Sequence, residues 1–164
     1  MATLSAYGLS VEAPAGWDAS IYKRKEPELA LQRLGAEQAD LHAVEYNPIL
    51  HLCTRPLPVV RGDMGGGVVS ELGPGDVFLV LFEYSGESAA TPLFAKTPTV
   101  PWPLKLQDFS PAALRTQLPD QVGCQRFFSV NGRGFMLYVV LGSAAAAPVL
   151  LTKVNAALAA VRIG

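Results

Sequence analysis

The sequence predicts an α+β domain, in which an antiparallel β-sheet carries a C-terminal helix packed on one face. Three observations lead to this fold class. Asn131 and Gly132 separate two apolar runs, and both residues accept the positive φ of a tight hairpin turn. Over residues 148–161, large apolar side chains recur at three- and four-residue steps, which is the spacing of one helix face. The remaining strand-like segments follow one another without alternating helices, and this order favours antiparallel pairing.

The N-terminal segments read as two strands and a loop. Residues 7–12 alternate, with Tyr7, Leu9 and Val11 on one face, as in a half-buried strand. A turn at 14–17 leads into a returning strand at 20–25. Residues 27–42 read as a loop that could contain a short helix.

The central segments predict further strands separated by turns. Residues 49–54 form a short apolar strand, and the glycines of 62–67 form a flexible loop before a strand at 68–72. Residues 77–84 are apolar on both faces until Glu83, which indicates a central strand covered on both sides.

The segments before the hairpin are rich in proline. Residues 91–103 contain four prolines, which predict an extended segment outside the sheet interior. A strand is expected at 105–109. Ser110 and Pro111 form a good helix start, as a cap followed by proline at the first helical position, and predict a short helix to about residue 118. The hairpin register then places Val130 opposite Arg133, Phe128 opposite Phe135 and Phe127 opposite Met136.

The composition excludes several classes of protein. The 164 residues fit one domain, residues 1–164, and 50% of them are hydrophobic while only 16% are charged. The net charge of −1 gives no electrostatic basis for binding nucleic acid. No apolar run is long enough to span a membrane, and the first residues lack the pattern of a signal peptide. We therefore expect a cytoplasmic protein.

The residue types that carry catalysis or bind metals occur without a recognised pattern. Cys53 and Cys124 read as buried thiols, although a disulfide between them stays open. His51 and Cys53 lie on one face of a predicted strand, which packing explains better than nucleophilic catalysis. Together with His42 they show no ligand spacing for a metal. Solvent-exposed residues at strand ends give the same sequence pattern as the paired carboxylates of a glycosidase, so the pattern does not indicate catalysis. The carboxylates that flank predicted strands are Glu71, Asp76, Glu83 and Glu87. We expect no catalytic residue, no metal and no cofactor.

The strongest candidate contact residues are apolar. Leu93, Phe94, Val100 and Trp102 lie among prolines in a segment that is expected to be irregular. One interpretation is that this segment wraps a sheet face and completes the core. The other is a presented surface whose aromatic residues bind a protein partner, because a pre-extended proline-rich segment loses little entropy on docking.

Two segments resemble the PsbP/Mog1-like fold family. The opening GLSVEAPAGW is similar to the start of these domains, where a strand runs into a P-x-G-W turn. The ending has the turn NGR, the strand LYVVLG, a helix and a strand-like VRI. The resemblance implies an accessory or adaptor role in bacteria and supplies no active-site residues.

These observations predict a small, non-catalytic adaptor that acts through protein–protein contacts, as a subunit of a bacterial assembly or as a homo-oligomer. The alternative is a domain that binds a small ligand or lipid in a pocket between sheet and helix.

Overall fold

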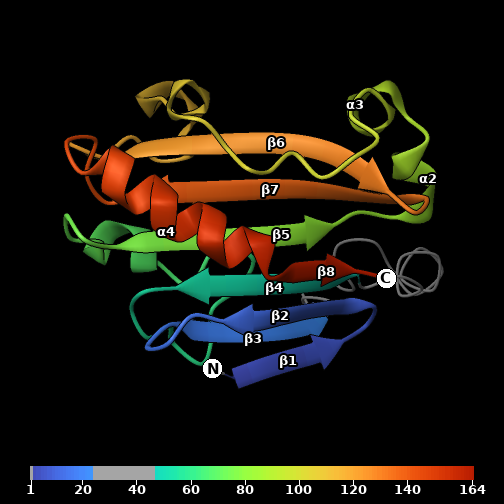
Figure 1. Cartoon of the computed structure of the whole chain (residues 1–164), viewed down its shortest axis with the longest axis horizontal. Helices are drawn as coiled ribbons and strands as arrows, with labels where there is room; N and C mark the ends of the chain where they lie inside the picture. The colour runs from blue at the N-terminus through green and yellow to red at the C-terminus, as the bar shows by residue number, and fades with distance from the viewer. Residues whose placement is uncertain (1, 24–46) are drawn as a thin grey trace, which may run out of the picture.

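The computed structural model describes residues 2–23 and 47–164, and eight strands in these ranges form two antiparallel sheets (Figure 1). One sheet has five strands in the order β3-β4-β5-β7-β6, and the other has three in the order β1-β2-β8. The fold class α+β, with antiparallel strands and a C-terminal helix, is confirmed, while the second sheet was not expected. The strands are β1 (Ala2–Ala6), β2 (Leu9–Ala13), β3 (Asp18–Lys23), β4 (Pro48–Cys53), β5 (Val77–Glu83), β6 (Val122–Val130), β7 (Arg133–Leu141) and β8 (Val161–Ile163).

The predicted hairpin is confirmed as β6 and β7. Asn131 and Gly132 form its two-residue loop with φ of 52° and 75°, as a type I′ turn requires. The register pairs Val130 with Arg133 and Phe128 with Phe135, as expected from the loop alone. A tight local turn therefore sets the alignment of the two longest strands.

Strand β5 lies at the centre of the five-stranded sheet and is buried along its whole length, as predicted. Its alternate side chains enter two different cores. Leu79 and Leu81 belong to the larger core, and Phe78 and Val80 belong to a second core on the opposite sheet face.

The larger core is covered by helix α4 (Ala147–Ala159) and by the three-stranded sheet, which lie in one layer in front of the five-stranded sheet (Figure 1). Leu150, Val154 and Leu158 form the buried face of α4, which confirms the predicted helix. The helix ends before Val161, which starts β8 and pairs with Val11 of β2. The predicted helical range therefore runs two residues too far.

The second core is covered mainly by irregular chain. The segment 54–72 crosses this face and ends in a 3₁₀ helix, η1 (Val68–Glu71), so the strand predicted at 68–72 is wrong. Gly65, Gly66 and Gly67 all have positive φ and turn the chain onto the sheet, where Val68 is buried. Burial against the aromatic ring of Phe78 thus overrides the strand preference of the valines.

The proline-rich region is less extended than predicted. Two short helices, α2 (Gly86–Ala89) and α3 (Pro92–Ala95), pack against β6 and β7, so the extended prediction is wrong for the start of 91–103. Pro92 takes the first helical position, where its missing N–H costs nothing.

Two further elements are shorter or different from the prediction. The strand expected at 105–109 is the 3₁₀ helix η2 (Leu106–Asp108), whose first turn is closed by a hydrogen bond from the Lys105 N–H to the Asp108 carboxylate. The helix expected from residue 111 to about 118 is a single 3₁₀ turn, η3 (Pro111–Ala113).

The N-terminal prediction was correct in part. Leu9 and Val11 point into the larger core, but Tyr7 lies in the turn between β1 and β2 with φ of 53°. The returning strand begins two residues earlier than expected, at Asp18. The loop predicted at 27–42 lies outside the described residues.

Candidate functional site

The structure separates the four candidate contact residues. Leu93, on α3, is 55% exposed, whereas its neighbour Phe94 is only 4% exposed. The ring of Phe94 packs against Tyr84 and Phe127, with centroid distances of 5.0 and 5.6 Å. Phe94 therefore completes the packing at one end of the sheet, and Leu93 is the part of this pair that a partner can reach.

Trp102 and Val100 lie over the other face of the sheet. Both are half-buried against the larger core, and the Trp102 ring contacts Phe128 edge-on at 5.7 Å. Phe127 and Phe128 are successive residues of β6, so their side chains point to opposite faces. Phe94 and Trp102 thus do not form one common surface.

A more exposed apolar feature lies in the loop of residues 57–61, which we call the valine loop. Val59 is 95% exposed and Val60 is 87% exposed, while Leu57 at the start of the loop is buried. Large apolar side chains that are almost fully in water usually occur singly on a soluble protein. Here two adjacent valines project from the same turn.

Polar contacts hold the valine loop at both ends. The Leu57 N–H donates to the Asp18 carboxylate on β3 at 2.7 Å. The Arg61 guanidinium donates to the carbonyl of Pro58 at 3.1 Å and to the Ser20 hydroxyl at 3.0 Å, and it lies 3.4 Å from the Asp18 carboxylate. The loop is thereby fastened to the edge strand of the five-stranded sheet.

The chain also packs closely behind the valine loop. Gly66 has φ of 65°, and a Cβ at this position would lie 2.8 Å from the carbonyl oxygen of Val60. Only glycine allows this approach without displacing the backbone. The sequence contains a signal for this site, since two valines lie between proline and arginine outside any alternating pattern, but the prediction placed the contact residues elsewhere.

His51 lies under the same segment and is fully buried between Tyr22 and Phe78. Its Nε2 is 2.9 Å from the carbonyl oxygen of Asp63, and because a carbonyl only accepts, Nε2 carries the proton. Its Nδ1 has no hydrogen-bond partner in the described ranges. Desolvation by burial lowers the pKa of His51, so the ring is neutral at physiological pH.

The cysteines show no feature of activated thiols. Cys53 and Cys124 are free and buried, and they belong to the two different cores. Burial raises the pKa of Cys53 and raises the pKa of Cys124 to about 11. Since the thiolate is the nucleophile, both groups are in the unreactive form near neutral pH.

Two of the carboxylates considered for catalysis have structural partners. Glu83 accepts two hydrogen bonds from Arg133, at 2.9 and 2.7 Å. Burial opposes ionisation of Asp76, but hydrogen bonds from the Gly73 N–H, Thr54 and Arg55 outweigh it and lower the pKa of that carboxyl. These contacts close turns and join strands.

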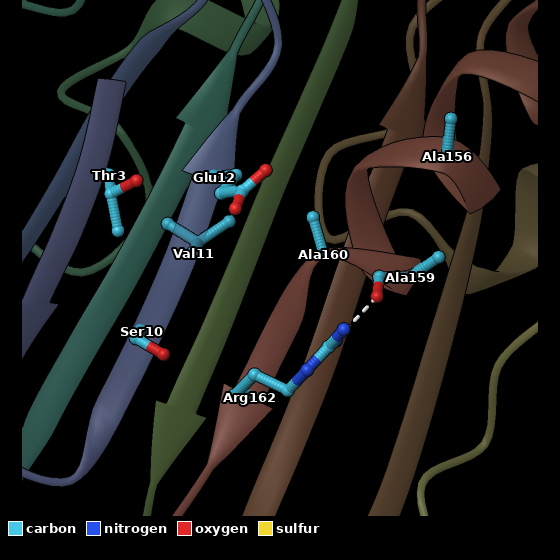
Figure 2. A pocket seen from close by; sticks show the side chains of 8 residues that line it. All are labelled: Thr3, Ser10, Val11, Glu12, Ala156, Ala159, Ala160 and Arg162. Carbon is cyan, nitrogen blue, oxygen red and sulfur yellow. Dashed lines mark hydrogen bonds between the residues drawn. The ribbon is translucent and has the colours of Figure 1, made fainter. Parts of the chain in front are cut away.

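A groove of about 340 Å³ lies between the outer face of the three-stranded sheet and the end of α4 (Figure 2). Ala156, Ala159 and Ala160 line its helix side, and the side chain of Arg162 runs toward the carbonyl of Ala159, to which it donates at 2.6 Å (Figure 2). The strand side contributes the polar Thr3, Ser10 and Glu12. The pocket expected for a small ligand or lipid was to lie between sheet and helix, whereas this groove lies on the outer face of the three-stranded sheet. It is open and offers no enclosed apolar volume for an acyl chain.

Within the described ranges, no group of three or more histidine, cysteine, aspartate or glutamate residues could hold a metal ion. None of the helices there is both long enough and apolar enough to cross a bilayer.

Comparisons of the chain with models of protein families, with characterised proteins and with solved structures found no match.

Proposed function

We propose that this protein is a small, non-catalytic accessory protein that binds a protein partner, or a second copy of itself, through the valine loop. The observation that carries the proposal is the exposure of Val59 and Val60, 95% and 87%, on a loop held at both ends. A cytoplasmic location, a bacterial assembly and the PsbP/Mog1-like relationship belong to the same proposal.

The energetics of the loop favour docking. Burying one exposed valine side chain stabilises a complex by about 1.5 kcal/mol, so two together are worth a factor of about 100 in Kd. A loop already fixed by Asp18 and Arg61 loses little conformational entropy when it binds. The valine loop therefore has the properties of a preformed contact.

Of the residues predicted from the sequence, Leu93 fits this proposal best as a second contact, because its side chain is accessible. Val100 and Trp102 keep part of their surface in water and stay candidates for a contact on the opposite sheet face. Phe94 supports the position of Leu93 by filling the core beneath α3.

The test compares the double variant Val59→Ser/Val60→Ser with Val149→Ser. Val149 is an equally apolar exposed residue, but it lies on α4, over the opposite face of the sheet. Each protein is tagged at native expression, and sedimentation velocity measures self-association. In a separate, otherwise wild-type chain, a photo-crosslinking amino acid at position 60 identifies direct contacts.

We expect the wild type and Val149→Ser to form the same stoichiometric complex, and the double variant to lose it by about 100-fold in Kd. Thermal unfolding should be the same for all three proteins, since these side chains contribute little to the core. An unchanged complex in the double variant, or no complex and no self-association in the wild type, contradicts the proposal.

A further inference from the structure

A second hollow of about 340 Å³ lies on the sheet face opposite α4, between the end of the segment 54–72 and residues 115–118. Its floor is the ring of Tyr138, a buried residue of strand β7, which lies beside the central strand β5. Its walls are the half-buried, apolar side chains of Met64, Val69 and Leu118. The hollow thus has an apolar interior that reaches the sheet.

The rim of this hollow carries one cation. Arg115 is exposed, and its guanidinium makes no hydrogen bond or ion pair in the part of the chain that the structure describes. Among the residues that the structure describes, no aspartate or glutamate lines the hollow. The neutral polar groups beside Arg115 are the hydroxyls of Ser70 and Thr116.

Arg115 differs in this respect from the other arginines of the described ranges. Four of them pair with a carboxylate within 3.4 Å, and a fifth donates to two backbone carbonyls. These are Arg55, Arg61, Arg126, Arg133 and, for the carbonyls, Arg162. Arg115 alone among them has all its donors available, and it lies at the mouth of an apolar hollow.

The floor supplies another hydrogen-bond donor and fixes the position of the rim. The Tyr138 hydroxyl accepts from the backbone N–H of Arg115 at 2.9 Å, which ties residue 115 to the sheet. The hydroxyl hydrogen of Tyr138 has no acceptor among the described residues, and the side chain is buried. Because Tyr138 lines the open hollow, its hydroxyl is available to donate to a bound acceptor.

We propose that this hollow binds a small carboxylic acid with a compact apolar body, such as one aromatic ring on a short chain. The carboxylate pairs with the guanidinium of Arg115, for which a planar two-oxygen acceptor is the best geometric match. The apolar body lies against Met64, Leu118 and the Tyr138 ring. The volume is at the lower end of the range for small-molecule sites, which limits the ligand to about the size of a phenylpropionate.

This site is separate from the proposed partner contact of the valine loop, and either can be wrong without the other. The test is a titration of the ¹⁵N-labelled full chain with 3-phenylpropionate, followed by ¹H–¹⁵N correlation spectra. The matched ligand control is 3-phenylpropanamide, which has the same shape and no charge. The matched protein variants are Arg115→Gln and Lys153→Gln, the latter removing one exposed cation from α4 on the opposite face.

We expect saturable shifts of the backbone amides of Gly67, Val69 and Thr116 with the acid, and binding at least about tenfold weaker for the amide and for Arg115→Gln. Lys153→Gln should bind as the wild type does. No saturable shift up to about 10 mM acid, equal binding of acid and amide, shifts elsewhere only, or an unchanged affinity in Arg115→Gln would each overturn the proposal.

Discussion

Replacing Arg133 with methionine should destabilise the protein more than removing any other ion pair that the structure shows. Arg133 begins β7, and its guanidinium donates to both oxygens of Glu83 at the end of β5. It also donates to the carbonyls of Tyr7, Gly8 and Gly164 at 3.1, 3.2 and 2.8 Å. One side chain therefore joins the five-stranded sheet to one end of the three-stranded sheet, where the turn between β1 and β2 lies beside the residue that follows β8.

The size of the effect follows from the burial of its partner. Glu83 is only 8% exposed, so Arg133→Met leaves a nearly buried carboxylate without its counter-charge. The variant also removes one donor from each of three carbonyls, of which that of Gly8 still accepts from the Gly164 N–H. Breaking a buried pair by removing one partner costs about 3–5 kcal/mol. The guanidinium carbon also lies 5.2 Å from the centroid of the Phe135 ring, and methionine loses this cation–π contact while it keeps an apolar stem.

The assay is urea unfolding followed by circular dichroism. With a slope of about 2 kcal/mol per M, the midpoint should fall by about 2 M. The control is Arg126→Met, which breaks a more exposed pair with Asp108 and should cost about 1 kcal/mol or less. In the Arg133→Met background, Glu83→Gln should cost less than in the wild type, because it removes the unpaired charge. Equal midpoints for the two arginine variants, or costs of Arg133→Met and Glu83→Gln that simply add, would refute the reasoning.

Two further predictions concern a glycine and the buried histidine. A Cβ at Gly142 would overlap the carbonyl oxygen of Gly73, so Gly142→Ala should lower the free energy of unfolding by about 3 kcal/mol or more. The control Gly86→Ala has open space around the added Cβ and should change the free energy of unfolding by less than about 1 kcal/mol. Urea midpoints check both, and equal values would contradict the close approach. The pKa of His51 in the folded state lies below its usual 6.5, so the unfolded chain binds the proton at a higher pH than the folded protein does. The free energy of unfolding should therefore be unaffected above about pH 6.5 and fall progressively below it. His51→Phe should reduce this slope between about pH 7 and 5, as measured by thermal unfolding, and an identical slope would show that His51 is not the titrating group.

The elements predicted correctly are those whose conformation is specified by nearby residues. The Asn131-Gly132 turn sets its own register, because both residues accept positive φ and a two-residue loop permits one alignment. The buried face of α4 repeats at the helical period, and residues 77–84 are apolar on both faces. Each of these patterns can be recognised within about ten consecutive residues.

The errors occur where distant contacts outweigh the local pattern. Val68 and Val69 have high strand preference, yet this segment forms a 3₁₀ turn. The three preceding glycines have positive φ and turn the chain so that Val68 becomes buried. The three-stranded sheet depends on Val11 pairing with Val161, and no turn joins these two segments. Pairing of such distant segments leaves no short-range signal in a single sequence.

The candidate sites were harder to predict than the fold for the same reason. Leu93, Phe94, Val100 and Trp102 share a proline-rich segment, but the exposure of each depends on which sheet face it meets. The sequence Pro-Val-Val-Arg does not say whether its valines are buried, and only the structure shows that Val59 and Val60 are exposed. The hollow beside Arg115 is built from three separate segments, and the absence of a partner for a guanidinium is a property of the assembled fold.

By itself, the sequence determined the fold class, the hairpin, the central strand and the terminal helix, because turn residues and hydrophobic periodicity act over short distances. The tertiary structure alone decided the second sheet, the Arg133 contacts between the two sheets, and the exposure of each apolar side chain. These features depend on free energies of burial and pairing between segments far apart in the chain, and such energies exist only once the chain has folded.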